Sequence, residues 1–267
     1  MTFASAVAAL LFVAVAMSAI MQLAAWIERR TGNSGWIDVV WTFGLGATGT
    51  AGALLPFGDG PLARRLFVAA LVVAWALRLG LHIAGRTKGI SDDPRYARMK
   101  RDWGPEAPAR MARLLQFQAL ASIPLAIGIV LAAHNPAALG QAQDALGLAI
   151  FVTGIAGGAI ADRQLRAFAR SERGGVCDTG LWAYSRHPNY FFEAVLWCAY
   201  AVIASAVAYP IGWFAWLAPA AITLLLVRIS GIPPLEEHML AKHGAAYRDY
   251  QSRTSAFIPL PPQGARP

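Results

Sequence analysis

The sequence predicts an all-α polytopic membrane protein, and its composition and apolar runs are the observations that predict it. Of the 267 residues, 57% are hydrophobic and only 14% are charged, whereas about a quarter of an average soluble domain is charged. The mean hydropathy is +0.46. Such a chain has too few polar side chains to cover a soluble globule, so we expect much of its surface to face lipid.

Seven apolar runs approach the roughly 20 residues that a helix needs to cross a bilayer. They occupy residues 4–27, 36–55, 66–83, 114–133, 145–160, 190–208 and 211–229. Asp38 and several glycines interrupt the second run, and only a turn at Tyr209 and Pro210 separates the last two. Because the first run has no basic start, we expect a retained helix rather than a cleaved signal peptide.

The distribution of basic residues predicts the orientation. Segments 84–113 and 161–189 are rich in Arg and Lys, whereas segment 134–144 has neither. The positive-inside rule then places the N-terminus outside and the C-terminus in the cytoplasm. Arg64 and Arg65 fall on the outer side, where Arg29 and Arg30 offset them. We attribute the net charge of +8 to the basic loops rather than to nucleic-acid binding, and the two cysteines give neither a disulfide framework nor metal-ligand spacing.

Ionisable residues fall within or beside the predicted spans, at Asp38, Arg78, His82 and Glu193. A charge at the bilayer centre costs about 3 kcal/mol or more, so such residues pair or line a cavity. Trp75, Arg78 and His82 share one helical face, as do Asp38 and Trp41. Two interpretations stay open: an Asp38–Arg78 pair that only joins two helices, or a polar pocket with tryptophan walls that holds an apolar substrate.

The segment Arg186-His187-Pro188 precedes the sixth run, where proline suits the first turn of a helix. The start of that helix offers free N–H groups to an anion. Asn189 and Glu193 are four residues apart, so they project from one face. These side chains either cap the helix or bind the polar groups of a carboxamide, a ribose or an amino acid.

Two further segments have a structural and a functional interpretation. Asp162, Arg166, Arg170 and Arg173 recur with helical spacing below the fifth run. This stripe faces either anionic lipid or the phosphates of a ligand. The tail contains Glu236, Lys242, Tyr247 and Tyr250, and it forms either an interfacial amphipathic helix or a lid over a cofactor.

Segments 181–193 and 236–259 together resemble the C-terminal half of the steroid 5-alpha-reductase family, and most closely a bacterial branch whose substrates are undefined. The Arg-His-Pro-Asn-Tyr core also resembles the sterol delta-14 reductases. The region 78–103, with Asp93-Pro94-Arg95-Tyr96, is similar to the bacterial branch. The resemblance implies a multi-pass protein of the bacterial inner membrane with seven helices. It implies an NADPH site on the cytoplasmic side and reduction of a carbon–carbon double bond conjugated to a carbonyl, of the 3-oxo-5-alpha-steroid 4-dehydrogenase type.

The resemblance also implies roles for individual residues in one membrane domain over residues 1–267. Residues 1–113 would form the substrate side and residues 114–267 the cofactor side. The implied NADPH-binding residues are Asp162, Arg166, Arg170, Tyr184, Arg186, His187, Asn189, Tyr190, Glu193, Glu236, His238 and Tyr247. Candidates for the catalytic polar donor are Asp38, Arg78 and His82, with Trp41 and Trp75 as pocket walls. We expect a lipid-soluble small-molecule substrate and no metal.

One feature departs from the steroid enzymes. Those enzymes bind and protonate the enone with a Gln-Glu pair on the second helix and a Tyr on the third. Here the second helix offers Asp38 and Trp41, and the matching position on the third is Trp75. The identity of the proton donor is therefore open.

A second resemblance competes with the first. Isoprenylcysteine carboxyl methyltransferases and phospholipid methyltransferases share Arg-His-Pro before a membrane helix and a Glu-Glu pair in the tail, here Glu236 and Glu237. In those enzymes this region binds S-adenosylmethionine. The arginine stripe favours the reductase, because S-adenosylmethionine carries no phosphate.

Overall fold

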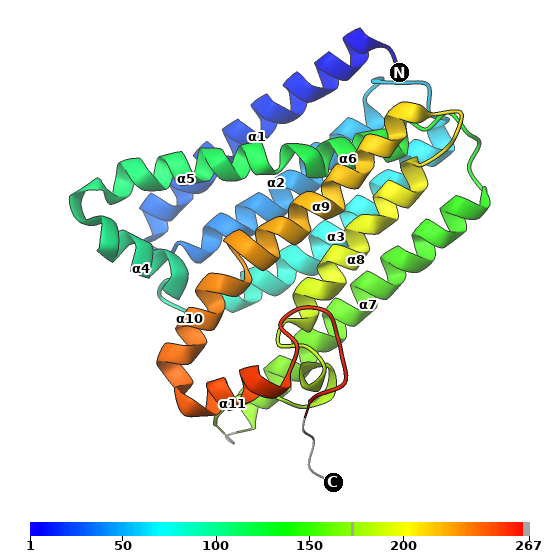
Figure 1. The fold of residues 1–267 in the computed structure, drawn as a ribbon. Coiled ribbons are helices and arrows are strands. Elements are labelled where there is room, and N and C mark those ends of the chain that lie inside the picture. Colours follow the sequence, from blue (N-terminus) through cyan, green and yellow to red (C-terminus); the bar gives the residue numbers. More distant parts are fainter. Residues whose placement is uncertain (172–173, 264–267) are drawn as a thin grey trace. The chain divides into compact units, whose positions relative to one another are not determined.

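The computed structural model describes residues 1–171 and 174–263, which form helices and loops with no β-strand among them (Figure 1). The predicted all-α fold class is confirmed. The chain divides into two compact units, one of Met1–Gly147 with Ala199–Ala221 and one of Leu148–Cys198 with Ile222–Pro267. Arg173, the last member of the predicted arginine stripe, lies outside the described residues.

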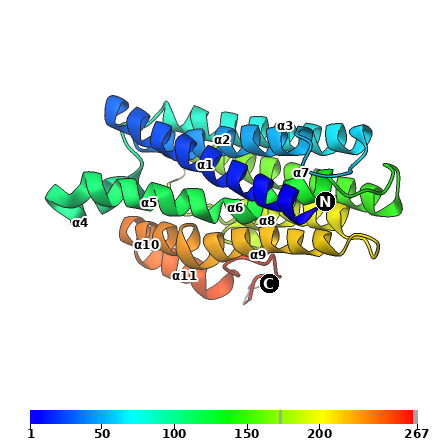
Figure 2. The ribbon, with the colours of Figure 1, turned by 90° about the horizontal axis from the view of Figure 1, so that it is seen from above.

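The first unit is built around a glycine-rich helix. Its elements are α1 (Phe3–Thr31), α2 (Gly35–Leu54), α3 (Leu62–Thr87), α4 (Pro94–Trp103), η1 (Gly104–Glu106), α5 (Ala107–Ala121), α6 (Ile123–Ala133) and η3 (Pro210–Trp216). Helix α2 contacts α1, α3 and α6, and α5 and α6 follow each other alongside α1 and α2 (Figure 2). A Cβ atom on Gly49 of α2 would lie only 2.7 Å from Ile129 of α6. The glycines that interrupt the second apolar run therefore allow close helix packing.

The second unit contains most of α7 (Ala142–Arg170) and α8 (Pro188–Ala204), together with the end of α9 (Leu217–Leu224). Its other elements are η2 (Gly180–Ala183), η4 (Leu225–Ile229), α10 (Ile232–His243) and α11 (Ala245–Arg253). Helices α7 and α8 approach closely at Gly154, where a Cβ atom would lie 2.6 Å from Leu196. The two helices are thereby fixed side by side, which positions the polar residues at their ends.

Five helical stretches among the described residues are long and apolar enough to cross a membrane. They are Phe3–Thr31, Leu62–Thr87, Pro94–Ala133, Ala142–Arg170 and Pro210–His243. Helices α2 and α8 contain two of the seven apolar runs but are not among these five. The helices indicate a membrane-embedded protein, while the count of seven spans, the orientation and the choice of membrane remain predictions.

The structure explains why Arg64 departs from the positive-inside pattern. Arg64 is fully buried, and its Nη1 and Nη2 donate to Asp144 Oδ1 and Oδ2 at 2.6 and 2.9 Å. It also donates to the carbonyl oxygens of Ala137 and Ala138. Because this charge is neutralised inside the first unit, it is not a free cation that would draw its end of α3 to the cytoplasm.

Candidate functional site

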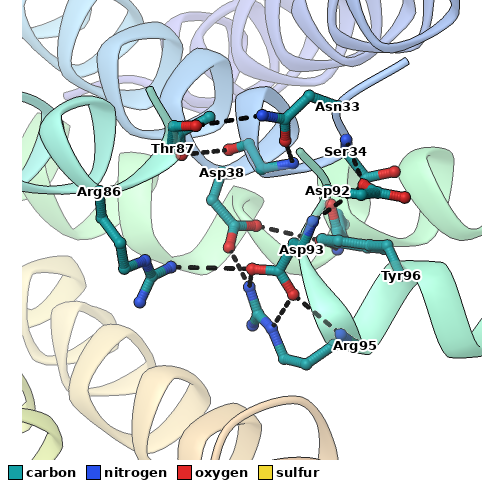
Figure 3. Close-up of polar contacts among 11 residues, drawn as sticks. Asn33, Ser34, Asp38, Arg86, Thr87, Asp92, Asp93, Arg95 and Tyr96 are labelled. Carbon is teal, nitrogen blue, oxygen red and sulfur yellow. Dashed lines mark hydrogen bonds and ion pairs between the residues drawn. The ribbon is translucent and has the colours of Figure 1, made fainter. Parts of the chain in front are cut away.

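A polar network at the start of α2 and α4 contains Asp38, the first predicted donor (Figure 3). Arg95 Nη2 donates to Asp38 Oδ2 at 2.5 Å, and the Tyr96 hydroxyl donates to Oδ1 at 3.0 Å. Gln118 Nε2 of α5 in turn donates to the Tyr96 hydroxyl at 3.0 Å. We call Asp38, Arg95, Tyr96 and Gln118 the Asp38 network. It joins a carboxylate to a guanidinium, a phenol and an amide, and the last three are groups that can donate to a carbonyl oxygen.

The start of α4 positions two members of this network. Asp93 is the N-cap residue, its carboxylate accepts from the Arg95 backbone N–H, and Pro94 occupies the first turn. Asp93 also accepts from Arg95 Nε at 3.0 Å, as Figure 3 shows. Burial by itself would raise the pKa of Asp93, but the hydrogen bonds and charge of Arg95, with the charge of Arg86, lower it below its ordinary value. The cap thus holds Arg95 with its guanidinium directed to Asp38.

The loop before α2 is joined by further hydrogen bonds to the end of α3 and the loop before α4. Asn33 Nδ2 donates to the Thr87 carbonyl oxygen, and the Ser34 N–H donates to Asp92 (Figure 3). Asn33 Nδ2 also donates to the Ile90 carbonyl oxygen. Lys100 forms ion pairs with Glu28 at 3.1 Å and with Asp92 at 2.9 Å. Tyr96 is almost fully buried beside them. The network is consequently held by contacts from α1, α2, α3 and α4.

The two predicted tryptophan walls lie together in the first unit. The rings of Trp41 and Trp75 meet edge to face, with centroids 6.4 Å apart, and Trp41 Nε1 donates to the Ser122 hydroxyl. Arg78 and His82 lie one turn apart on α3 and are partly buried. The described contacts of Asp38 are to Arg95 and Tyr96, so pairing of Asp38 with Arg78 stays a prediction.

In the second unit, α7 and α8 bring together Asp162 and Asn189, two of the residues with implied NADPH contacts. Asn189 Nδ2 donates to Asp162 Oδ1 at 3.4 Å, and Asp162 is buried. Glu193, one turn further along α8, accepts from Trp197 Nε1 at 3.0 Å. This group combines an amide with two carboxylates beside the N-terminal end of α8.

Arg166 and Arg170 follow Asp162 at four-residue spacing on α7, and both are exposed. Residues at this spacing share a helix face. Two exposed guanidinium groups therefore lie on the same face of α7 as the Asp162–Asn189 pair. Binding of a phosphate ligand to this face stays a prediction.

Three residues with implied cofactor contacts, Arg186, His187 and Glu236, bind one another in the structure. Glu236 Oε1 accepts from Arg186 Nε at 2.6 Å and from His187 Nε2 at 3.1 Å. Gln251 Nε2 donates to Glu236 Oε2 at 2.9 Å, and Arg186 Nη1 donates to the Thr254 carbonyl oxygen. We call this group the Glu236 latch, because it fixes the tail to the loop before α8.

His187 has one ring nitrogen that the latch does not use. Nδ1 is buried and has no hydrogen-bond partner in ranges 1–171 and 174–263, while the ring stacks on Tyr190 at a centroid distance of 5.5 Å. Burial lowers the pKa of His187 below its ordinary value, and hydrogen bonding to Glu236 only partly opposes this effect. The imidazole is therefore neutral at pH 7.

The rest of the tail packs around segment 181–187. The Tyr250 hydroxyl donates to the Trp182 carbonyl oxygen at 2.5 Å, the Leu260 N–H donates to that of Tyr184, and the Arg186 N–H donates to that of Ser255. Tyr247 is buried against Tyr250, and burial raises its pKa. Of the remaining implied cofactor residues, Tyr184 and His238 are exposed. The tail thus covers a loop of its own chain.

Sequence reasoning did not assign a role to Arg95, Tyr96, Gln118 or Gln251. The Asp93-Pro94 pair is a helix-start signal that the sequence analysis did not use, and in the structure it begins α4. It gave no indication that Tyr96 meets a carboxylate 58 positions earlier in the chain. The described residues contain no group of three or more His, Cys, Asp or Glu side chains that could hold a metal ion.

Comparison with known proteins assigns the chain to a family but not to an activity. No curated protein shows significant similarity to it. Residues 25–254 match the model of a family described as "Protein of unknown function (DUF1295)". The match spans both the Asp38 network and the Glu236 latch. The chain therefore belongs to the DUF1295 family, whose function is unknown.

Proposed function

We propose that the protein is an NADPH-dependent membrane reductase. The substrate class is a lipid-soluble steroid-like or isoprenoid compound with a carbon–carbon double bond conjugated to a carbonyl. The observation that carries the proposal is the arrangement on α7 and α8, where the Asp162–Asn189 pair shares a helix face with exposed Arg166 and Arg170. The resemblance of segments 181–193 and 236–259 to reductases supports it.

The side chains on α7 and α8 have the charges and hydrogen-bonding groups that NADPH requires. A pyrophosphate and a 2′-phosphate need cationic partners, for which the planar forks of Arg166 and Arg170 are suited. The N–H groups of Tyr190 and Phe191 at the start of α8 donate to the His187 carbonyl oxygen, so the arginines carry the proposed phosphate contacts. Asn189 and Glu193 supply an amide and a carboxylate for a carboxamide and ribose hydroxyls. When bound, NADPH supplies the hydride that adds to the β-carbon of the enone.

The Asp38 network is the proposed donor group for the substrate carbonyl. The single O–H of Tyr96 donates to Asp38, so in this proposal it turns to the substrate carbonyl while Gln118 continues to donate to the phenol oxygen and Arg95 keeps a positive charge beside Asp38. A phenol held in this way stabilises the negative charge that develops on a carbonyl oxygen. Arg78 and His82 remain candidates for the same role. Trp41 and Trp75 would provide apolar walls for the substrate.

A methyltransferase that uses S-adenosylmethionine and acts on a lipid carboxylate or amine is the second candidate. The contact of Glu236 with Arg186 and His187 favours it, because this contact joins the Arg-His-Pro and Glu-Glu segments of the methyltransferase resemblance. The reductase remains the first choice because the Glu236 carboxylate is fully engaged in holding the tail. A reductase also gives Arg166 and Arg170 a role, because they can bind the phosphates of NADPH.

The experiment is a fluorescence titration of detergent-solubilised protein and its variants with NADPH and NADH. Each lost charge-assisted phosphate contact costs about 1.5–3 kcal/mol, or about 10- to 100-fold in affinity. Arg166→Ala or Arg170→Ala should lower the affinity for NADPH by this factor, and at least one of them should lower the affinity for NADH much less. Glu193→Gln should weaken both nucleotides.

Arg248→Ala provides a matched control, because Arg248 is exposed on α11 of the same unit and its loss changes the net charge equally. If Arg248→Ala weakens NADPH as much as Arg166→Ala, the specific phosphate site does not exist.

A further inference from the structure

A groove lies where α4 meets α5 in the first unit, and neither the Asp38 network nor the Glu236 latch uses it. Its volume is about 390 Å³, and its lining residues are Trp103, Arg110, Arg113, Leu114 and Phe117. The last four recur at i, i+3, i+4 and i+7 and so share one face of α5. Gly104, with a φ of 52°, ends α4 and turns the chain, which sets Trp103 beside that face.

The groove has a cationic part and an apolar part. Arg110 and Arg113 are exposed, and the only ion pair of Arg110 within the described ranges is an exposed one between its Nε and Glu106 at 2.7 Å. Exposed pairs of this kind contribute little and exchange readily for a better anion. Arg113 has no ion pair with any residue in 1–171 or 174–263. The two guanidinium groups thus offer most of their donors to an anionic group.

The position of the groove along the helix matches the edge of a bilayer. The apolar run 114–133 begins directly after Arg113, and 20 helical residues span about 30 Å, the thickness of the hydrocarbon core. Arg110 and Arg113 are then at the level of the lipid headgroups. Phe117 and Leu120 continue the same face into the apolar run and are 67% and 58% exposed.

We propose that this groove binds an anionic phospholipid. The lipid phosphate is held by Arg110 and Arg113, whose planar forks match phosphate oxygens. Trp103 contacts the interfacial region, where tryptophan is favoured, and one acyl chain lies along Phe117 and Leu120. The charge of the arginines excludes a purely apolar ligand, and the exposed apolar side chains below them favour a lipid over a free phosphate.

The test is native mass spectrometry of the purified full-length chain, titrated with phosphatidylglycerol or with phosphatidylcholine of the same acyl chains. The wild type should retain phosphatidylglycerol in preference to phosphatidylcholine. An arginine near an anionic headgroup contributes about a fivefold gain in affinity. The double variant Arg110→Gln and Arg113→Gln should therefore lower the affinity for phosphatidylglycerol about 25-fold. Phe117→Ala should weaken both lipids, because it removes only apolar contact.

The matched control is Arg98→Gln with Arg101→Gln, two exposed residues of α4 outside the groove whose loss changes the net charge equally. It should leave binding within about twofold of wild type, since exposed charges away from a ligand contribute little. An equal loss in this control would show non-specific charge attraction and overturn the site. Displacement of the lipid by inorganic phosphate at equal concentration would also overturn the proposal.

Discussion

Replacing Glu236 by Gln should detach the tail from the loop before α8. The Glu236 and Arg186 side chains are only 16% and 11% exposed, and the carboxylate accepts three hydrogen bonds within the second unit. The amide oxygen of Gln still accepts from Arg186 and His187 but without the carboxylate charge, and the amide NH2 group cannot accept from Gln251. At about 1 kcal/mol for each weakened or lost hydrogen bond, the total cost is about 3 kcal/mol. Glu236→Ala, which leaves the Arg186 charge without its partner, should cost about 3–5 kcal/mol.

Thermal unfolding in detergent measures this effect, with limited proteolysis of the tail as a second readout. For a chain of this size, about 3 kcal/mol lowers Tm by about 6–12 °C. Asp249→Asn is the control, because this carboxylate is also in the tail but is 72% exposed in its pair with Arg253. It should change stability by less than about 0.5 kcal/mol. If Glu236→Gln has the same Tm as the wild type and its tail is cleaved no faster, the Glu236 latch does not hold the tail.

Three other predictions address packing, pH and the Asp38 network. Gly154→Ala should destabilise the protein by about 1–3 kcal/mol, because its Cβ atom would meet the Leu196 backbone. Gly85→Ala is the control and should be neutral or stabilising, because Gly85 has open space around it. The Tm values of both variants test this prediction. Because the folded pKa of His187 lies below its ordinary value of 6.5, the unfolded chain binds more protons. The contribution of neutral His187 to the free energy of unfolding should therefore be fully present above pH 6.5 and be lost as the pH falls towards the folded pKa. His187→Gln should remove this part of the pH dependence of Tm. Tyr96→Phe should lower the free energy of unfolding by about 1–3 kcal/mol, because it leaves the buried polar partners of the phenol unsatisfied. It should change the Kd for NADPH less than twofold. An unchanged Tm would show that the phenol does not stabilise the Asp38 network.

The sequence predicted the all-α fold class because apolar run length is a local property of the chain. It did not predict why Asp38 and the glycines interrupt the second run, since the reasons are contacts with other helices. The glycines make room for neighbours such as Ile129, and Asp38 binds Arg95, 57 positions later. Such partners depend on how the helices pack, which periodicity does not encode.

The same limit applies to the candidate site. The spacing of Asn189 and Glu193 predicted that both lie at the start of α8, whereas the hydrogen bond from Asn189 to Asp162 of α7 appears only in the structure. Sequence pattern did not distinguish ligand-binding residues from residues that bind each other, and Arg186 and Glu236 bind each other across 50 positions. A buried ion pair and a ligand contact use the same residue types, so composition and spacing do not separate them.

The central claim is that the second unit binds NADPH, and calorimetric titration of the wild-type protein tests it most directly. NADPH, NADH and S-adenosylmethionine are each titrated into the detergent-solubilised full-length chain. The arrangement of Arg166 and Arg170 beside the Asp162–Asn189 pair predicts micromolar or tighter binding of NADPH and weaker binding of NADH. Micromolar binding of S-adenosylmethionine with no heat from NADPH would contradict the reductase and favour a methyltransferase.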